Sequence, residues 1–479
     1  MGGGKPPGVQ NHRKAALCGE PERDSRFMRK SFKHSSRQSQ GGSWRDYQAG
    51  LQRRSNGRRL FRRVALRGLV VALLGTGLFF GLQALPRGGD SPSPIGAAQA
   101  SLPALPAAGL TGKKELRQLL DQQAFNNLTE KALDLPVDGQ VLRVETSLDV
   151  DLQNYLLERL DRKHSRYLGI VVMEADTGRI LAMVGFDREN PSGNPCLLSE
   201  FPAASIFKIV TAASAVDQCG YTADSPMQFN GYKHTLYKRQ LTQAVNRNTN
   251  TLSFEEAFAQ SVNPVFGKLG QLSLGREQLE KSASAFAFNE PLDFELPLAP
   301  SHFTISDQPY HWAELASGFN RETTISPLHG ALMASAVLND GRMVEPSIVD
   351  RVVGADGEQL YLSQPQWGPQ AMSAKASSVL SRMMEGTVES GTARKFFRGY
   401  QKDRALADLE IGGKTGSIDS SDHEARYDWF VGFAKERQGP RQLVVAAMVA
   451  HEKFIGTRAS QYARMAMTRY FGQESPGRN

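Results

Sequence analysis

Residues 169–184 read GIVVMEADTGRILAMV, which is two apolar runs on either side of Asp176-Thr-Gly178. Short apolar runs around such a turn sequence predict an antiparallel hairpin. A matching pair stands near the end of the chain, where residues 428–433 and 443–449 flank Arg437-Gln-Gly-Pro440. We predict that the hairpins from the two ends of this region form one antiparallel sheet.

The segments between and beyond these hairpins have helical spacing. Residues 149–162 predict a helix whose apolar face is formed by Leu152, Tyr155, Leu156 and Leu160. Residues 113–133 predict a short helix, and residues 459–470 predict another that follows the last strand. Strand hairpins around a helix-rich middle predict an α+β fold, with an antiparallel sheet covered by helices on both faces.

Composition excludes a small scaffold held together by disulfides. The chain has 479 residues, of which 40% are hydrophobic, 22% are charged and only three are cysteines. Residues 1–67 hold 17 Lys and Arg against four acidic residues, a net +13, so the other 412 residues carry −5 of the total +8. An acidic body with a basic tail argues against a nucleic-acid partner.

An uncharged run of 18 residues, 68–85, follows this tail and reads GLVVALLGTGLFFGLQAL. As a helix it would be about 27 Å long, enough to cross a bilayer. The basic residues before this run predict that it is an anchor in the inner membrane, with residues 1–67 in the cytoplasm and the residues after the anchor in the periplasm. The composition of residues 1–67 predicts a disordered tail. The alternative is a signal peptide cleaved after Ala98-Gln99-Ala100.

Two residues that could do chemistry lie in a stretch that favours helix, FPAASIFKIVTAASA, residues 201–215. Ser205 and Lys208 are three positions apart, so on a helix they share one face. A lysine there can take the proton of the serine if burial lowers its pKa. The alternative is an exposed lysine at a helix start, but the residues after Lys208 are apolar and favour a buried helix.

Two further motifs follow in order. Ser261-Val-Asn263 begins 56 residues after Ser205, and Lys414-Thr-Gly-Ser417 begins 153 residues after Ser261. With these motifs, residues 142–470 resemble the penicillin-binding protein transpeptidases, a family whose wider fold includes the serine β-lactamases. The resemblance is to monofunctional, class B-like members. It divides the chain into a tail (1–67), an anchor (68–85), a Pro/Ala-rich linker with a short helical stalk (86–141), a transpeptidase domain (142–470) and an end segment (471–479).

The resemblance implies a role for each motif residue. Ser205 would be the nucleophile and Lys208 its base, while Ser261 would relay a proton between Lys208 and Lys414, and Asn263 would orient the substrate amide. Thr415, Gly416 and Ser417 would bind the terminal carboxylate of the substrate. The backbone N–H groups of Ser205 and Ser417 would form the oxyanion hole.

The implied function is a membrane-anchored D,D-transpeptidase that cross-links peptidoglycan stem peptides and is acylated by β-lactams. A D,D-carboxypeptidase, a β-lactamase, or a sensor or wall-binding scaffold without turnover remains an alternative. The resemblance implies no cofactor, and the histidines lack metal-ligand spacing. Other cell-wall synthesis proteins could be partners. Ala204 and Ile206, where family members commonly have Gly and Thr or Val, leave the substrate preference open.

Cys196 and Cys219 lie on either side of the Ser205 helix. If the domain is in an oxidising compartment, these two residues could form a disulfide, and two buried thiols are the alternative.

Overall fold

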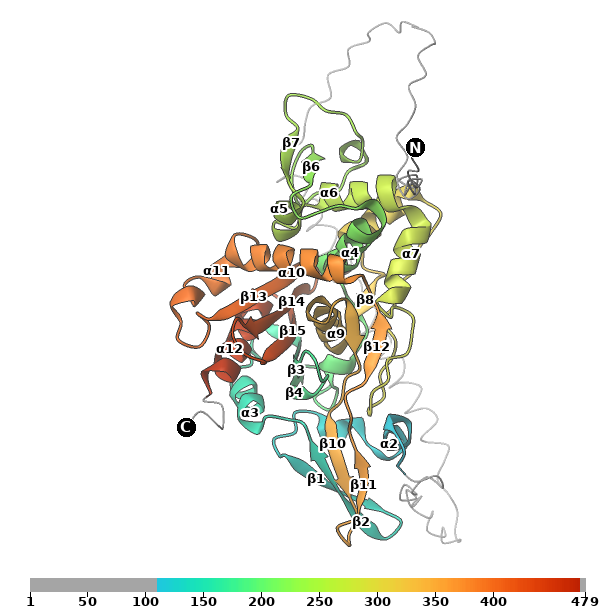
Figure 1. Cartoon of the computed structure of the whole chain (residues 1–479), viewed down its shortest axis with the longest axis vertical. Helices are drawn as coiled ribbons and strands as arrows, with labels where there is room; N and C mark the ends of the chain where they lie inside the picture. Colours follow the sequence, from blue (N-terminus) through green and yellow to red (C-terminus); the bar gives the residue numbers. More distant parts are fainter. Residues whose placement is uncertain (1–109, 474–479) are drawn as a thin grey trace, which may run out of the picture. The chain divides into compact units, whose positions relative to one another are not determined.

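This computed structural model of the chain describes residues 110–473 (Figure 1). The tail, the anchor and most of the linker predicted for residues 1–109 lie outside this range, as do residues 474–479. Within residues 110–473, no helix combines the length and the apolar character that a membrane crossing requires.

A five-stranded antiparallel sheet forms the centre of the fold. Its order is β13-β14-β15-β3-β4, so the two predicted hairpins do join, through pairing of β15 with β3. The strands are β3 (Ser165–Glu174), β4 (Ile180–Asp187), β13 (Leu409–Asp419), β14 (Arg426–Glu436) and β15 (Gln442–His451). The order leaves β13, which carries the Lys414 motif, at one edge of the sheet.

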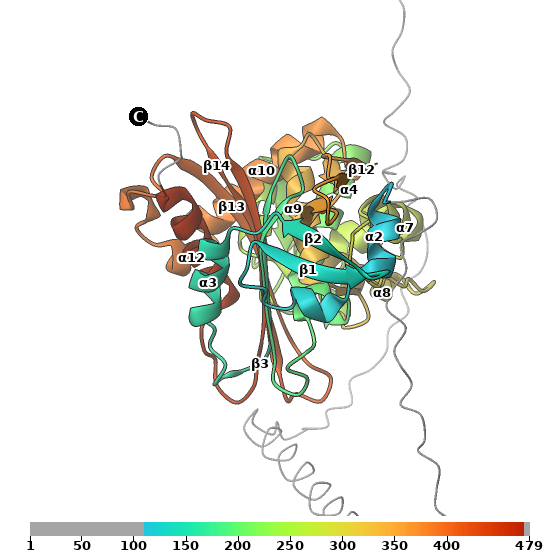
Figure 2. The same cartoon turned by 90° about the horizontal axis from the view of Figure 1, so that it is seen from below.

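Helices cover both faces of this sheet, as predicted for an α+β fold (Figure 2). On one face lie α3 (Val150–Glu158), α11 (Arg394–Phe397) and α12 (Ala459–Gly472), which share a buried cluster with alternate residues of the strands. On the other face lie α4 (Lys208–Cys219) and α9 (Pro327–Leu338). Alternation of side chains along each strand supplies one apolar set to each face.

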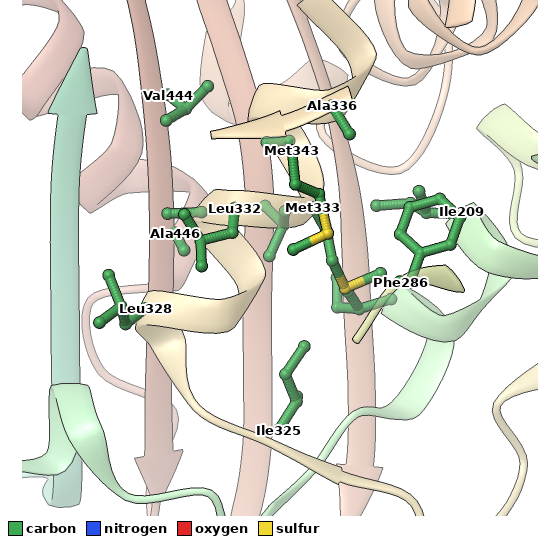
Figure 3. Close-up of a cluster of buried hydrophobic side chains, with 14 of the residues drawn as sticks. Ile209, Phe286, Ile325, Leu328, Leu332, Met333, Ala336, Met343, Val444 and Ala446 are labelled. Carbon is green, nitrogen blue, oxygen red and sulfur yellow. The ribbon is translucent and has the colours of Figure 1, made fainter. Parts of the chain in front are cut away.

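Helix α9 is the centre of the larger core. Every residue from Pro327 to Val337 is buried, which requires an apolar helix surface on all sides. Figure 3 shows Leu332 beside Val444 and Ala446 of β15, with Ile209 of α4 and Phe286 on the opposite side of the helix. The helix therefore joins the sheet to the helical part that carries Ser205.

The remaining helices surround α4 and the edge of the sheet. They are α5 (Phe254–Ala259), α6 (Asn263–Lys268), α7 (Gly275–Ala285), α8 (Pro309–Ser317) and α10 (Ala374–Glu389). Three short antiparallel pairs connect them: β5 (Phe201–Pro202) with β8 (Thr324–Ile325), β6 (Pro226–Phe229) with β7 (Asn250–Ser253), and β9 (Arg342–Val344) with β12 (Trp367–Gln370).

A second sheet, which the sequence pattern did not indicate, lies at the lower end of Figure 1. It has the order β1-β2-β10-β11, with β1 (Ala132–Val137), β2 (Gln140–Thr146), β10 (Val349–Val353) and β11 (Gln359–Leu362). The domain start predicted at residue 142 falls inside β2.

The helix predicted for residues 113–133 is wrong beyond its first part. Helix α2 (Lys113–Leu119) is followed by a 3-10 turn, Gln122–Phe125, and then by β1. Leu120 and Asp121 have extended backbone, with ψ angles of 129° and 124°, so the helix ends after Leu119. Of the residues predicted as helix, 132 and 133 lie in β1.

The structure has no disulfide between Cys196 and Cys219. The Cys196 thiol is buried beside the sheet and donates to the carbonyl oxygen of Val184 at 3.2 Å. Cys219 ends α4, about 17 Å of helix beyond Lys208, and packs against a separate cluster with Leu274 and Leu279. The structure therefore disfavours the disulfide and agrees with the alternative of two unbridged cysteines, because α4 carries Cys219 away from Cys196.

We predict that Cys196 resists alkylation in the folded protein at pH 8, because burial raises the pKa of its thiol to about 12. After denaturation without a reductant, iodoacetamide should label both Cys196 and Cys219, as read by peptide mass mapping. A peptide pair linked through these two cysteines would contradict the structure.

Candidate active site

Ser205 lies in a strained turn between β5 and α4. The turn is the 3-10 segment η3 (Ala204–Phe207), and Ala204 has a φ of +48°, a left-handed conformation that is uncommon for a residue with a Cβ. Trp429 of β14 holds the chain just before the turn, since its Nε1 donates to the carbonyl oxygen of Pro202 at 2.9 Å. The turn leaves Ser205 half-buried, while both of its neighbours are buried.

Lys208 begins α4 and is completely buried. Its Nζ lies 2.8 Å from Ser205 Oγ and 2.8 Å from Asn263 Oδ1, and it also contacts the carbonyl oxygen of Ser317. Burial first, and then the positive charge of Lys414, hold the pKa of Lys208 well below its usual value. The structure therefore favours a neutral amine at this position.

The three partners of Lys208 suit a neutral amine that acts as a base. A neutral amine keeps two N–H groups and one lone pair. Asn263 Oδ1 and the Ser317 carbonyl oxygen can only accept, so they take the two N–H groups. The lone pair is then left for the hydroxyl proton of Ser205, which is the arrangement that nucleophile activation needs.

Ser261 and Asn263 lie in the connection between α5 and α6. Ser261 has a φ of +55°, and its Oγ accepts from Lys414 Nζ at 3.0 Å. Asn263 begins α6, and its backbone N–H donates to the carbonyl oxygen of Lys233 at 2.7 Å. Because Asn263 Oδ1 binds Lys208, its Nδ2 remains as a donor. The sequence predicted Ser261 between the two lysines; here its hydroxyl is bound to Lys414.

Lys414 lies on the edge strand β13 and is also completely buried. Besides Ser261, its Nζ donates to the carbonyl oxygen of Thr415 at 2.8 Å. Burial lowers the pKa of Lys414 to about 7. Near neutral pH the group can therefore take up or release a proton.

The other residues of the Lys-Thr-Gly-Ser motif continue along the strand. Thr415 Oγ1 and Thr392 Oγ1 are 2.5 Å apart. A Cβ at Gly416 would lie 3.3 Å from Ile206, so a side chain there would press on the residue after Ser205. Ser417 is exposed and its Oγ donates to Asp428 Oδ1 at 3.3 Å. The oxyanion hole from the N–H groups of Ser205 and Ser417 stays a prediction.

The site also includes residues that the motifs did not indicate. Ser317 and Gly318 end α8, and Gly318 has a φ of +65°. A Cβ on Gly318 would lie only 1.9 Å from the carbonyl oxygen of Ala204, so the end of α8 packs directly on the turn that carries Ser205. A glycine after a helix can be read from sequence as a C-cap, but its contact with a turn more than a hundred residues away cannot.

Asp428 is a second such residue. It pairs across the sheet with Ser417 and is buried. Two hydrogen bonds from Arg458, at 2.8 and 2.6 Å, fix its carboxylate, and the backbone N–H of Ala459, the first residue of α12, donates to it at 2.9 Å. The hydroxyl of Ser417 is thereby tied to the start of α12.

Comparisons with known proteins agree with the fold. The family model for the penicillin binding protein transpeptidase domain matches residues 168–469. A peptidoglycan D,D-transpeptidase, PbpA of Mycolicibacterium smegmatis, is 26% identical over 315 residues, covering 58% of this chain and 61% of the relative. Penicillin-binding protein PbpB of the same organism is 25% identical over 301 residues, covering 59% of this chain and 45% of the relative. The chain thus spans about half to three fifths of these curated relatives.

Solved structures share the fold at low sequence identity. Penicillin-binding protein A of Mycobacterium tuberculosis, in a ceftriaxone acyl-enzyme complex, has a TM-score of 0.57 at 20% identity, covering 69% of this chain and 80% of that chain. The D,D-transpeptidase domain of a peptidoglycan glycosyltransferase from Eggerthella lenta has a TM-score of 0.57 at 23% identity, covering 74% and 87%.

We predict that Gly318→Ala slows the reaction with a fluorescent penicillin by about 100-fold or more, because the new Cβ displaces the turn that carries Ser205. Gly220→Ala is the matched control: Gly220 also ends a helix, with a φ of +71°, but nothing lies within 4 Å of its Cβ position. It should cost about 1–2 kcal/mol of stability and leave the reaction rate nearly unchanged. Equal rates in the two variants would contradict the packing argument.

We also predict that Lys414→Met raises the melting temperature near neutral pH. The pKa of Lys414 is depressed in the folded state, so between about pH 7 and 10.5 the unfolded chain binds the extra proton and stability rises with pH. The increase in melting temperature caused by Lys414→Met should therefore be largest at or below pH 7 and become smaller toward pH 10. Scanning fluorimetry checks this trend, with exposed Lys375→Met as the control; a gain independent of pH would refute the assignment.

Proposed function

Because the chain belongs to the penicillin-binding protein transpeptidase family, we propose that it is a serine D,D-transpeptidase that cross-links peptidoglycan stem peptides. The observation that carries this proposal is the buried Lys208 amine, 2.8 Å from Ser205 Oγ, with its other two contacts made to acceptor oxygens. The name of the relative PbpA, a peptidoglycan D,D-transpeptidase, supports the same reaction.

In the first half of the reaction, Ser205 Oγ gives its proton to Lys208 and bonds to the carbonyl carbon of the peptide bond before the terminal residue. The C–N bond breaks, and the leaving amine takes a proton from Ser261, which Lys414 resupplies. The 3.0 Å contact between Lys414 and Ser261 supports this transfer. Asn263 Nδ2 would bind the substrate amide.

In the second half, the amine of another stem peptide attacks the ester carbon. The C–O bond breaks, and Ser205 recovers its proton from Lys208. The proton lost by the attacking amine passes through Ser261 to Lys414. Every group then returns to its starting state, so the cycle needs no cofactor.

The terminal carboxylate of the substrate would be bound by the Lys-Thr-Gly-Ser strand. A carboxylate near Lys414 favours the protonated form of this lysine. Because its pKa is about 7, substrate binding can shift Lys414 to the protonated form at a small cost in free energy. The hydroxyls of Thr415 and Ser417 project from the same face of the strand. This is the recognition that a β-lactam carboxylate would share.

Membrane anchoring through residues 68–85 is part of the proposal. It would hold residues 1–67 in the cytoplasm and the catalytic domain on the outer side of the inner membrane, where its substrate lies. The charge pattern of the sequence supports this topology.

We predict that a penicillin forms a covalent adduct with Ser205 that persists for many minutes. Intact mass spectrometry should show one adduct per chain, none in Ser205→Ala, and formation slowed by about 10²–10⁴-fold in Lys208→Ala, because the base is lost. Peptide mapping should place the adduct on Ser205. An adduct in Ser205→Ala would show that the nucleophile is another residue.

The molecule that accepts the acyl group from Ser205 distinguishes a transpeptidase from the alternative enzymes. A stem-peptide donor with an amine acceptor should give the cross-linked product in excess of the hydrolysed donor. Hydrolysis alone would indicate a D,D-carboxypeptidase, and release of opened penicillin within seconds would indicate a β-lactamase. Acylation without turnover of any stem peptide would indicate a sensor or scaffold.

A further inference from the structure

The connection between β6 and β7, residues 230–249, differs in charge from the rest of the domain. We call it the basic loop. Residues 225–254 contain no Asp or Glu, and the basic loop holds Lys233, Lys238, Arg239 and Arg247. Residues 68–479 as a whole carry −5. A concentrated positive segment on an acidic body gives a local attraction for anionic partners.

The basic loop is folded against the helices below it. Leu236 and Leu241 are buried against Ala313 of α8, and a Cβ on Gly267 of α6 would lie 2.7 Å from the Leu236 side chain. Tyr310 Oη donates to the carbonyl oxygen of Leu236 at 2.7 Å. The loop surface is therefore formed before any partner binds, which reduces the ordering entropy that binding costs.

The outer side of the basic loop presents aromatic rings beside the cations. Tyr232 is 81% exposed and Tyr237 is 51% exposed. Arg239 lies 5.3 Å from the ring centre of Tyr237. Within residues 110–473, no carboxylate lies within ion-pair distance of any of the four basic side chains of the loop. Exposed rings and uncompensated cations together are typical of a binding surface.

The basic loop continues directly into the catalytic site. The carbonyl oxygen of Lys233 accepts the backbone N–H of Asn263 at 2.7 Å, and Lys233 Nζ donates to Gln260, the residue before Ser261. In Figure 1, β6 and β7 lie next to α5 and α6. A polymer that reaches Ser205 past Asn263 would therefore run along the loop.

We propose that the basic loop binds the glycan and carboxylate-bearing stem peptides of the peptidoglycan strand outside the catalytic cleft. This inference rests on the proposed function. Tyrosine rings offer flat contact surfaces with a polar tip for sugar rings, and Lys and Arg bind carboxylates. An anionic membrane is less suited to the loop, because membrane-surface segments bury Trp, Phe and Leu. The exposed face offers only Val245 as a large aliphatic side chain.

The test measures binding of the full chain, held in phosphatidylcholine nanodiscs, to purified peptidoglycan sacculi. Lys238→Glu with Arg239→Glu should weaken cosedimentation by about tenfold, because two exposed charge contacts are reversed. Tyr232→Ala should weaken it without changing the charge. The effect of the charge reversal should diminish as salt rises.

The matched control is Lys281→Glu with Lys375→Glu, which makes the same charge change at exposed positions on α7 and α10. Every variant keeps residues 1–67, so the contribution of the basic tail cancels. Lys233 and His234 are left unchanged because they adjoin the catalytic site. Melting temperatures of all variants should agree within a few degrees, which excludes unfolding as the cause.

Each outcome separates the two proposals. Loss of sacculus binding in the loop variants, with penicillin acylation of Ser205 intact, supports the inference. Equal binding by the loop variant and the control overturns it. So does a difference confined to liposomes of phosphatidylglycerol and phosphatidylethanolamine, which would make the loop a membrane surface. Absence of a penicillin adduct in the unmodified chain would instead refute the proposed function.

Discussion

The buried Lys208 amine is the contact on which the arrangement of the site depends. Its three partners come from three parts of the fold: Ser205 in the turn before α4, Asn263 at the start of α6 and Ser317 at the end of α8. Removing a charged amine from water costs several kcal/mol, and the neutral form avoids that cost while keeping all three contacts. The same burial that favours the neutral amine therefore also holds the three elements together.

A second buried lysine, Lys414, makes this arrangement sensitive to charge. Two ammonium groups in one desolvated site would repel each other, and the charge of Lys414 contributes to the lowered pKa of Lys208. Burial of Lys208 and Lys414 does not stabilise the fold, so the stability must come from the surrounding apolar core. Helix α9, buried along nearly its whole length between the sheet and α4, is part of that core.

Sequence reasoning identified the elements that local patterns determine. The hairpins at 169–184 and 428–449 were predicted from short apolar runs around turn sequences. The three motifs pointed to Ser205, Lys208, Ser261, Asn263 and Lys414, which the structure brings together. The second sheet was not predicted, because its hairpin of β1 and β2 becomes part of a sheet only where β2 pairs with β10, about two hundred residues later. The contact of Gly318 with the Ser205 turn and the tie from Ser417 through Asp428 to α12 were missed for the same reason. Both depend on tertiary neighbours rather than on spacing along the chain.

In the proposed function, the position of β13 at the sheet edge would let a peptide lie beside it. An edge strand has backbone groups on one side that no neighbouring strand occupies, and on this side Lys414 meets the helical part that carries Ser205. Ser417 of this strand is hydrogen-bonded to Asp428, which is in turn bound by Arg458. These contacts fix the strand, so it would not need to move when a peptide lies along it. In the proposed function, the rest of a polymeric substrate would pass α5 and α6. The basic loop, packed on α6 and α8 and hydrogen-bonded to Asn263, would lie on that path, so one rigid part of the fold would carry both the reacting groups and the surface that binds the strand.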